Sequence, residues 1–151
     1  MPDDTDRRIL RHLLSDPDAD NATLASRAGV TATTLGRRLD RMRGSGIIQG
    51  TEARVDWRRL GYEVEVSLRF TLDKTEPRAL DLFTAAARQV PEVTEIQTFL
   101  GSVDIRLSVI ARDISHWQQI YRDRILALPH VTDIEPLMLV STIKDSQGLV
   151  L

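Results

Sequence analysis

The chain contains no cysteine among its 151 residues. This absence excludes a disulfide framework, a thiolate nucleophile and a cysteine-based zinc site. No apolar run approaches the roughly 18 residues that a membrane-spanning helix needs, and the acidic start MPDDTD lacks the basic and apolar regions of a signal peptide. We therefore expect a cytoplasmic protein that does not associate with membranes.

Sequence motifs typical of enzymes are also missing. The chain has no glycine-rich phosphate loop, no nucleophile elbow and no paired histidine and carboxylate motif. Its three histidines, His12, His116 and His130, are scattered without the spacing of metal ligands. We therefore expect no catalytic residues, no cofactor and no metal.

What the chain does contain is an ordinary globular composition with an uneven distribution of charge. It is 42% hydrophobic and 28% charged, with room for one large or two small domains. The net charge is −2, yet residues 31–60 hold seven arginines against three acidic residues, a local net charge of +4. The local electric field of this segment matters more than the total charge for attracting a polyanion.

Residues 22–48 carry two short helical patterns on either side of Gly29. Asn21 is expected to cap the first helix, Gly29 to form the turn, and Thr31 to cap the second helix. A buried stripe at intervals of four and three is predicted in the second helix, formed by Leu35, Leu39 and Met42. With a further helix over 6–14, these patterns predict a helix-turn-helix unit that docks on double-stranded DNA.

The face of the second helix opposite this stripe carries threonine and arginine. At about 100° per residue, the residues on this face are Thr33, Thr34, Arg37 and Arg41. Arginine provides a planar fork for guanine edges or phosphates, and threonine provides a hydroxyl and a methyl group. We expect these side chains to enter a DNA groove, Thr31 to join them at the helix start, and Arg38, on the flank, to contact a phosphate. The alternative is an ordinary solvated amphipathic helix.

Two glycines lie in the segment that follows the helix pair. Gly46, the pair Ile47 and Ile48, and Gly50 suggest a turn and a short strand, which would form a small wing. We therefore expect a winged helix-turn-helix domain over 1–50, a connector over 51–62 and a second domain over 63–151.

The hydrophobic period changes to two from Glu63 onward, which predicts a half-buried strand. Helical patterns follow over 77–90 and 114–128, and further strand patterns over 93–100, 103–111 and 131–143. The segments VPEVTEI and LPHVTDI are similar in sequence and lie 38 residues apart. Each marks a transition from a helix to a strand, which indicates two half-units of the same order. The fold class is therefore α+β, with a ferredoxin-like βαββαβ domain whose helices share one face of an antiparallel sheet.

The last strand pattern is apolar on both sides over residues 137–140. A partner sheet is the simplest cover for such a strand, and we infer a homodimer.

The chain resembles the Lrp/AsnC, or feast/famine, family of bacterial and archaeal transcription regulators. The matching segments, in order over about 3–145, are DTDRRIL, LASRAGVTATTLGRRLDRM, GIIQGTEARVDWRRLGYEV, GSVD and VSTIK. The resemblance implies a winged helix-turn-helix joined to a ligand-sensing dimerisation domain. It also implies dimers that assemble into octamer-like rings, with amino acids or related metabolites in clefts between dimers.

The family's effector turn often reads Gly-Asp-aromatic-Asp, and this chain has Gly101, Ser102, Val103 and Asp104 at that place. The glycine lets a ligand approach the backbone, Asp104 is expected to accept a bond from an α-amino group, and Thr98 to add a hydroxyl. We expect an effector with an apolar or aromatic side chain. The alternative is an ordinary hairpin turn beside an exposed strand threonine.

Three functions follow from these patterns. The first is a sequence-specific DNA-binding transcriptional regulator that responds to an amino acid or a related small metabolite. The second is an architectural DNA-binding protein that needs no ligand. The third is an enzyme similar to the haem-pathway decarboxylases, which would need a histidine or arginine cluster in its cleft, and the sequence reveals none. We expect a regulator and not an enzyme.

Overall fold

The computed structural model describes residues 1–145, which divide into two compact units. One unit contains Met1–Arg54 and the segment that begins at Ile143, and the other contains Val55–Thr142. Among the described helices, none has the length and apolar character needed to cross a membrane.

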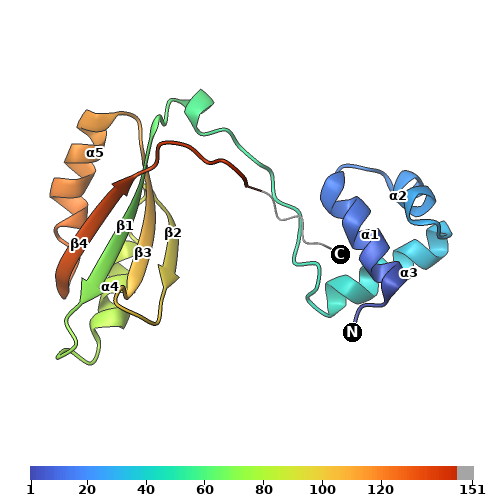
Figure 1. Ribbon diagram of the computed structural model, residues 1–151, viewed down its shortest axis with the longest axis horizontal. Coiled ribbons are helices and arrows are strands. Elements are labelled where there is room, and N and C mark those ends of the chain that lie inside the picture. Colours follow the sequence, from blue (N-terminus) through green and yellow to red (C-terminus); the bar gives the residue numbers. More distant parts are fainter. Residues whose placement is uncertain (146–151) are drawn as a thin grey trace. The chain divides into compact units, whose positions relative to one another are not determined.

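The first unit is built from three helices, α1 (Asp4–Ser15), α2 (Asn21–Ala28) and α3 (Ala32–Gly44) (Figure 1). The cap of α2 is Asp20 and not Asn21, because the Asp20 carboxylate accepts the backbone N–H of Thr23 at 2.7 Å. Gly29 ends α2 with a left-handed φ of 67°, and Thr31 caps α3. The helix-turn-helix is confirmed.

Burial in this unit follows the predicted periodicity. Leu35, Leu39 and Met42 are all buried, and they pack with Ile9 of α1 and Leu24 of α2. Because these side chains come from all three helices, the hydrophobic cluster fixes the orientation of α3 and sets which of its faces remains exposed.

The short strand expected after α3 does not form, and no strand lies between residues 45 and 63. The backbone N–H groups of Ile47 and Ile48 both donate to the carbonyl of Met42, at 2.9 and 3.1 Å, which folds the chain back onto the end of α3. A β-strand needs a neighbouring strand for its hydrogen bonds, and the described part of this unit offers none. The helix-turn-helix therefore lacks the expected wing.

The second unit contains a four-stranded antiparallel sheet in the order β2-β3-β1-β4. Its strands are β1 (Val64–Leu72), β2 (Val93–Thr98), β3 (Ile105–Ala111) and β4 (Val131–Met138). A 3₁₀ turn, η1 (Arg58–Leu60), precedes the sheet. The crossing helices are α4 (Ala79–Ala87) and α5 (Ile114–Ile120), the latter continued by the π-helical turn η2 (Tyr121–Ile125). This order confirms the predicted βαββαβ layout.

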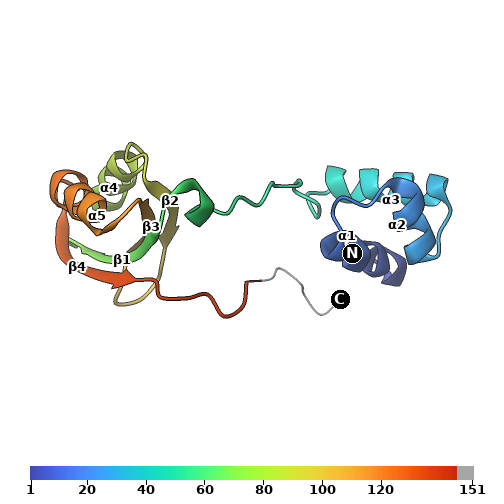
Figure 2. The ribbon, with the colours of Figure 1, turned by 90° about the horizontal axis from the view of Figure 1, so that it is seen from above.

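Both helices cover the same face of the sheet, as Figure 2 shows. Alternate residues of β1 are buried beneath them, and Phe70 of β1 contacts Phe83 of α4 with ring centroids 4.8 Å apart. The intervening residues of β1 and β3 point to the opposite face, which neither helix covers. We call this second face the open face; it carries the polar side chains that form part of the site described below.

Candidate nucleic-acid interface and ligand pocket

The outward face of α3 presents the side chains that the helical period predicted. Thr31, Thr33, Arg37 and Arg41 are exposed, and Thr34 is partly exposed. The hydroxyl of Thr31 accepts the backbone N–H of Thr34 at 3.2 Å and also donates to the Thr34 hydroxyl at 3.0 Å. Arg37 forms no ion pair with any residue in 1–145, which leaves its guanidinium free for an external acceptor.

Arg38 occupies a different environment from its neighbours on α3. Its Nη1 donates to Asp3 at 2.7 Å and to Asp6 at 2.8 Å, and its side chain is 18% exposed. The guanidinium is therefore directed to the start of α1, and the phosphate contact expected of Arg38 stays a prediction. The helical period places Arg38 on the flank of α3, but only the packing of α1 shows that two carboxylates lie there.

Arg41 shares this cluster but remains accessible. Its Nη2 donates to the second carboxylate oxygen of Asp6 at 2.6 Å, while its side chain is 59% exposed. Burial raises the pKa of Asp6. This effect is outweighed by the hydrogen bond from Arg38, by the hydrogen bond from the backbone of Asp3 and by the charge of Arg41, so the pKa is lowered. Asp6 thus stays ionised and holds Arg41 at the rim of the α3 face.

The turn between β2 and β3 is held by Asp104. Its Oδ2 accepts the backbone N–H of Leu72 at 2.8 Å, and its Oδ1 forms an ion pair with Lys74. The hydrogen bond from Leu72 lowers the pKa of Asp104, and Lys74 adds to the effect. The carboxylate is thus bound by Leu72 and Lys74, and its expected contact with the amino group of a ligand stays a prediction.

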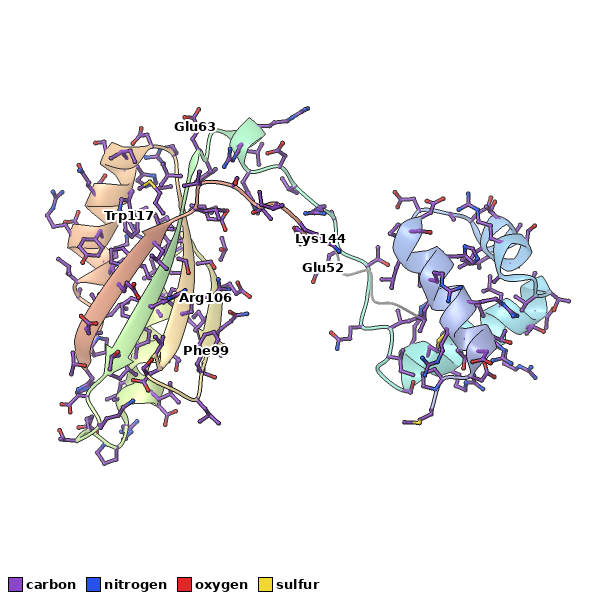
Figure 3. The ribbon with its side chains drawn as sticks, in the orientation of Figure 1. Glu52, Glu63, Phe99, Arg106, Trp117 and Lys144 are labelled. Carbon is purple, nitrogen blue, oxygen red and sulfur yellow. The ribbon has the colours of Figure 1, made fainter. Side chains whose placement is uncertain are left out.

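A cavity of about 500 Å³ lies at this turn and includes part of the predicted effector set. Gly101, Ser102 and Val103 line it, whereas Thr98 and Asp104 do not. The lining residues that sequence reasoning missed are Arg69, Gln97, Phe99, Leu100 and Arg106. Figure 3 shows Phe99 and Arg106 on the same side of the second unit.

Cross-strand register explains how the missed side chains meet. Gln97 of β2 lies opposite Arg106 of β3, which lies opposite Arg69 of β1, which lies opposite Glu135 of β4. The row crosses the open face of the sheet from edge to edge. The alternation of residues in each strand could have assigned these side chains to this face, but the order of the strands is needed to bring them together.

Ionisable side chains elsewhere in the described chain do not assemble into a metal site. Among residues 1–145, no group of three or more histidine, aspartate or glutamate side chains has the geometry to hold a metal ion.

Comparisons with known proteins match both units. The AsnC-type helix-turn-helix domain matches residues 3–43, and the Lrp/AsnC ligand binding domain matches residues 65–149. The chain is 35% identical to a proline dehydrogenase transcriptional activator of Rhodobacter capsulatus, over 85% of this chain and 84% of the relative. It is 29% identical to the leucine-responsive regulatory protein of Salmonella typhimurium, over 99% of this chain and 91% of the relative.

Solved structures show the same fold over nearly the full length. Escherichia coli AsnC is 26% identical with a TM-score of 0.87, covering 98% of both chains. A transcriptional regulator from Neisseria meningitidis, solved as a complex with L-Met, is 23% identical with a TM-score of 0.91, covering 99% of this chain and 96% of the other.

Proposed function

From the premise that the chain belongs to the Lrp/AsnC family of transcriptional regulators, we propose that α3 docks on double-stranded DNA and that a small metabolite in the second unit modulates this binding. The family makes the protein a regulator and not an enzyme. The observation that carries the proposal is the pairing of an exposed threonine and arginine face on α3 with a cavity in a separate sheet domain. Residues 51–62 serve as the connector between the domains over 1–50 and 63–151. The protein works in the cytoplasm, where its DNA target lies.

The DNA contacts come from the exposed side chains of α3. Arg37 is the base-reading candidate, because its fork is exposed and unpaired among residues 1–145. Thr31, Thr33 and Thr34 supply hydroxyls near the helix start, and Arg41 supplies a second fork at the rim. The local charge of +4 over 31–60 attracts the duplex despite the net negative charge of the chain.

Gel-shift titration on the DNA upstream of the protein's own gene tests this interface. Arg37→Ala should weaken binding by about 1 to 3 kcal/mol and relax the preference at one position in each half-site. Arg88→Ala is the matched control, because it removes the same charge from an exposed position after α4. Equal binding by the wild type and Arg37→Ala would show that α3 does not read DNA through this residue.

The effector is an amino acid or a related small metabolite. The support is the ligand-binding family match, together with a cavity lined by Gly101, Ser102 and Val103 at the family's effector turn. Relatives point the same way, since one is named leucine-responsive and a structural neighbour was solved with L-Met. A thermal-shift panel of amino acids and their metabolites tests it, because a ligand that binds only the folded state raises the melting temperature.

The regulator acts as a homodimer, with octamer-like rings as the higher assembly. Leu137 and Leu139 of the last strand and its continuation are 38% and 36% exposed, on a sheet face that no described helix covers. A second copy packed on the end of this face that carries Leu137 and Leu139 buries them, while the opposite end, at the β2–β3 turn, carries the cavity. Leu139→Asp should therefore yield monomers in light scattering, since it places a charge in a desolvated interface.

The control for that variant is Leu126→Asp. Leu126 is 55% exposed and follows the helical turn η2 on the covered side of the sheet. Its substitution adds the same charge without touching the open face. If Leu139→Asp remains fully dimeric at low micromolar concentration, the interface lies elsewhere.

An architectural role without a ligand is the second candidate. The observation that favours it is the state of Asp104, whose two carboxylate oxygens are already bound by Leu72 and Lys74. A thermal-shift panel without any response, combined with intact DNA binding, would support this role over ligand sensing.

A further inference from the structure

Two guanidinium groups and no carboxylate line the cavity at the β2–β3 turn. Arg69 comes from β1 and Arg106 from β3, and the remaining lining residues are uncharged. Phe99 and Val103 add apolar surface to the lining. A cavity of this composition favours a ligand with a negative charge and an apolar part.

The two arginines lie directly opposite each other on neighbouring strands. Like charges in this arrangement destabilise each other. The charge of Arg106 is balanced, because it donates to Gln97 at 2.9 Å and to Glu95 at 2.8 Å. Arg69 is held more loosely: its Nη1 forms an ion pair with Glu135 at 3.8 Å, a distance too long for a hydrogen bond, so its N–H donors are not used by this partner.

Of the two arginines, Arg69 is therefore the one whose N–H donors remain available to a ligand. Its side chain is 47% exposed and lines the cavity. A carboxylate that accepts both donors of its fork would gain charge-assisted hydrogen bonds. The same anion would also reduce the repulsion between Arg69 and Arg106.

An ammonium group entering this cavity would find no carboxylate among the lining residues, since Glu135 pairs with Arg69 and lies outside the lining. Asp104, the carboxylate of the turn, is bound to Leu72 and Lys74 and does not line the cavity. Glu95 is engaged by Arg106. A desolvated ammonium group without an anionic partner is costly, and two guanidinium groups in the lining would repel it.

We propose that the cavity selects an organic acid without an ammonium group, such as a 2-oxo acid with an apolar or aromatic side group. The carboxylate binds Arg69 beside Arg106, and the side group lies against Phe99 and Val103. This proposal rests on the proposed effector function of the same domain and narrows the effector from amino acids in general to their deaminated counterparts.

Calorimetry on the full chain with matched ligand pairs tests the proposal. The pairs are phenylpyruvate with phenylalanine, 4-methyl-2-oxopentanoate with leucine, and 4-methylthio-2-oxobutanoate with methionine. Within each pair only the α-substituent differs, so the comparison isolates the ammonium group. We expect at least one oxo acid to bind about tenfold or more tightly than its amino acid.

Variants then locate the binding site. Arg69→Gln should weaken oxo-acid binding by about tenfold or more, because it removes the charge but keeps a donor and most of the side-chain volume. Arg88→Gln, at an exposed position after α4, should leave the affinity unchanged. Unchanged affinity in Arg69→Gln would overturn the assignment of the site.

The outcomes also separate this proposal from the broader one. If each amino acid binds at least as tightly as its oxo acid, the proposed ligand class is wrong while the effector function stands. If no member of any pair binds, the ligand class is overturned, and the gel-shift test of Arg37 still decides independently whether the protein binds DNA.

Discussion

Arg38 in the middle of α3 lies 2.8 Å from the carboxylate of Asp6 in α1, which is only 2% exposed. Asp6 also accepts from Arg41 on the next turn of α3, so one buried carboxylate joins two arginines of the recognition helix. Asp3 completes the cluster, because its carboxylate accepts from both Arg38 and the backbone of Asp6. The start of α1 thus positions the helix that we propose to read DNA.

The first prediction concerns the stability of this cluster. Asp6→Asn should lower the free energy of unfolding by about 3 kcal/mol, because it leaves the poorly exposed Arg38 without one of its two carboxylates. Asp4→Asn, on the same turn but exposed and without an ion pair in 1–145, is the control and should change it little. Urea denaturation followed by circular dichroism measures both. Equal losses in the two variants would contradict a special role for Asp6.

The second prediction concerns pH. The hydrogen bond from Arg38 is the main cause that lowers the pKa of Asp3 from 3.8 to about 2. A carboxylate with a lowered pKa in the folded state stabilises fully above about pH 4, and this contribution is lost as the pH falls toward 2. Asp3→Asn keeps an oxygen to cap α1 but cannot ionise. The gap in melting temperature between wild type and Asp3→Asn should therefore be present at pH 5 and shrink toward pH 2, and a constant gap would refute this reasoning.

The third prediction separates the two arginines of the cluster by salt dependence. Arg41 is 59% exposed, and Arg41→Gln should reduce the slope of log affinity against log salt by about 0.9 if it contacts a phosphate. Arg38 is 18% exposed and bound to two carboxylates, so Arg38→Gln should leave the slope unchanged while lowering stability. Both slopes should be measured at a temperature where circular dichroism shows the variants folded. A lowered slope for Arg38→Gln would show that Arg38 contacts a phosphate.

The fourth prediction concerns the turn beside the cavity. Asp104→Ala should lower stability by about 1 to 3 kcal/mol, because the backbone N–H of Leu72 loses its acceptor. It should weaken ligand binding less than Arg69→Gln does, since Asp104 does not line the cavity. Thermal melts measure the loss of stability, and calorimetry on both variants compares their ligand affinities. Complete loss of binding in Asp104→Ala alone would make its carboxylate a direct ligand contact.

The periodic features of the fold were predictable from the sequence. The intervals of Leu35, Leu39 and Met42 predicted the buried side of α3, and all three side chains are buried. The alternation in β1 predicted one buried face, and Val66 and Phe70 lie on it. Such patterns are legible because the geometry of a helix or a strand repeats over a few neighbouring residues.

The boundaries of the strands were predicted less accurately from the sequence. The last strand ends at Met138 and not near 143, and the predicted wing is absent from the described residues. Strand length depends on a partner that can continue the hydrogen-bonded ladder. In β4 this partner is β1, whose pairing with it begins at Val66.

By itself, the sequence determined the helix-turn-helix, the βαββαβ order and the outward face of α3, because each depends on local periodicity, turn residues and helix caps. Only the tertiary structure decided that Arg38 turns inward to Asp3 and Asp6, more than 30 positions away in the chain. It also decided that Arg69 and Arg106 face one cavity while Asp104 is held by Leu72. The physical reason is that an ionisable side chain takes its role from the charges and donors that packing places around it, and these come from residues distant in sequence.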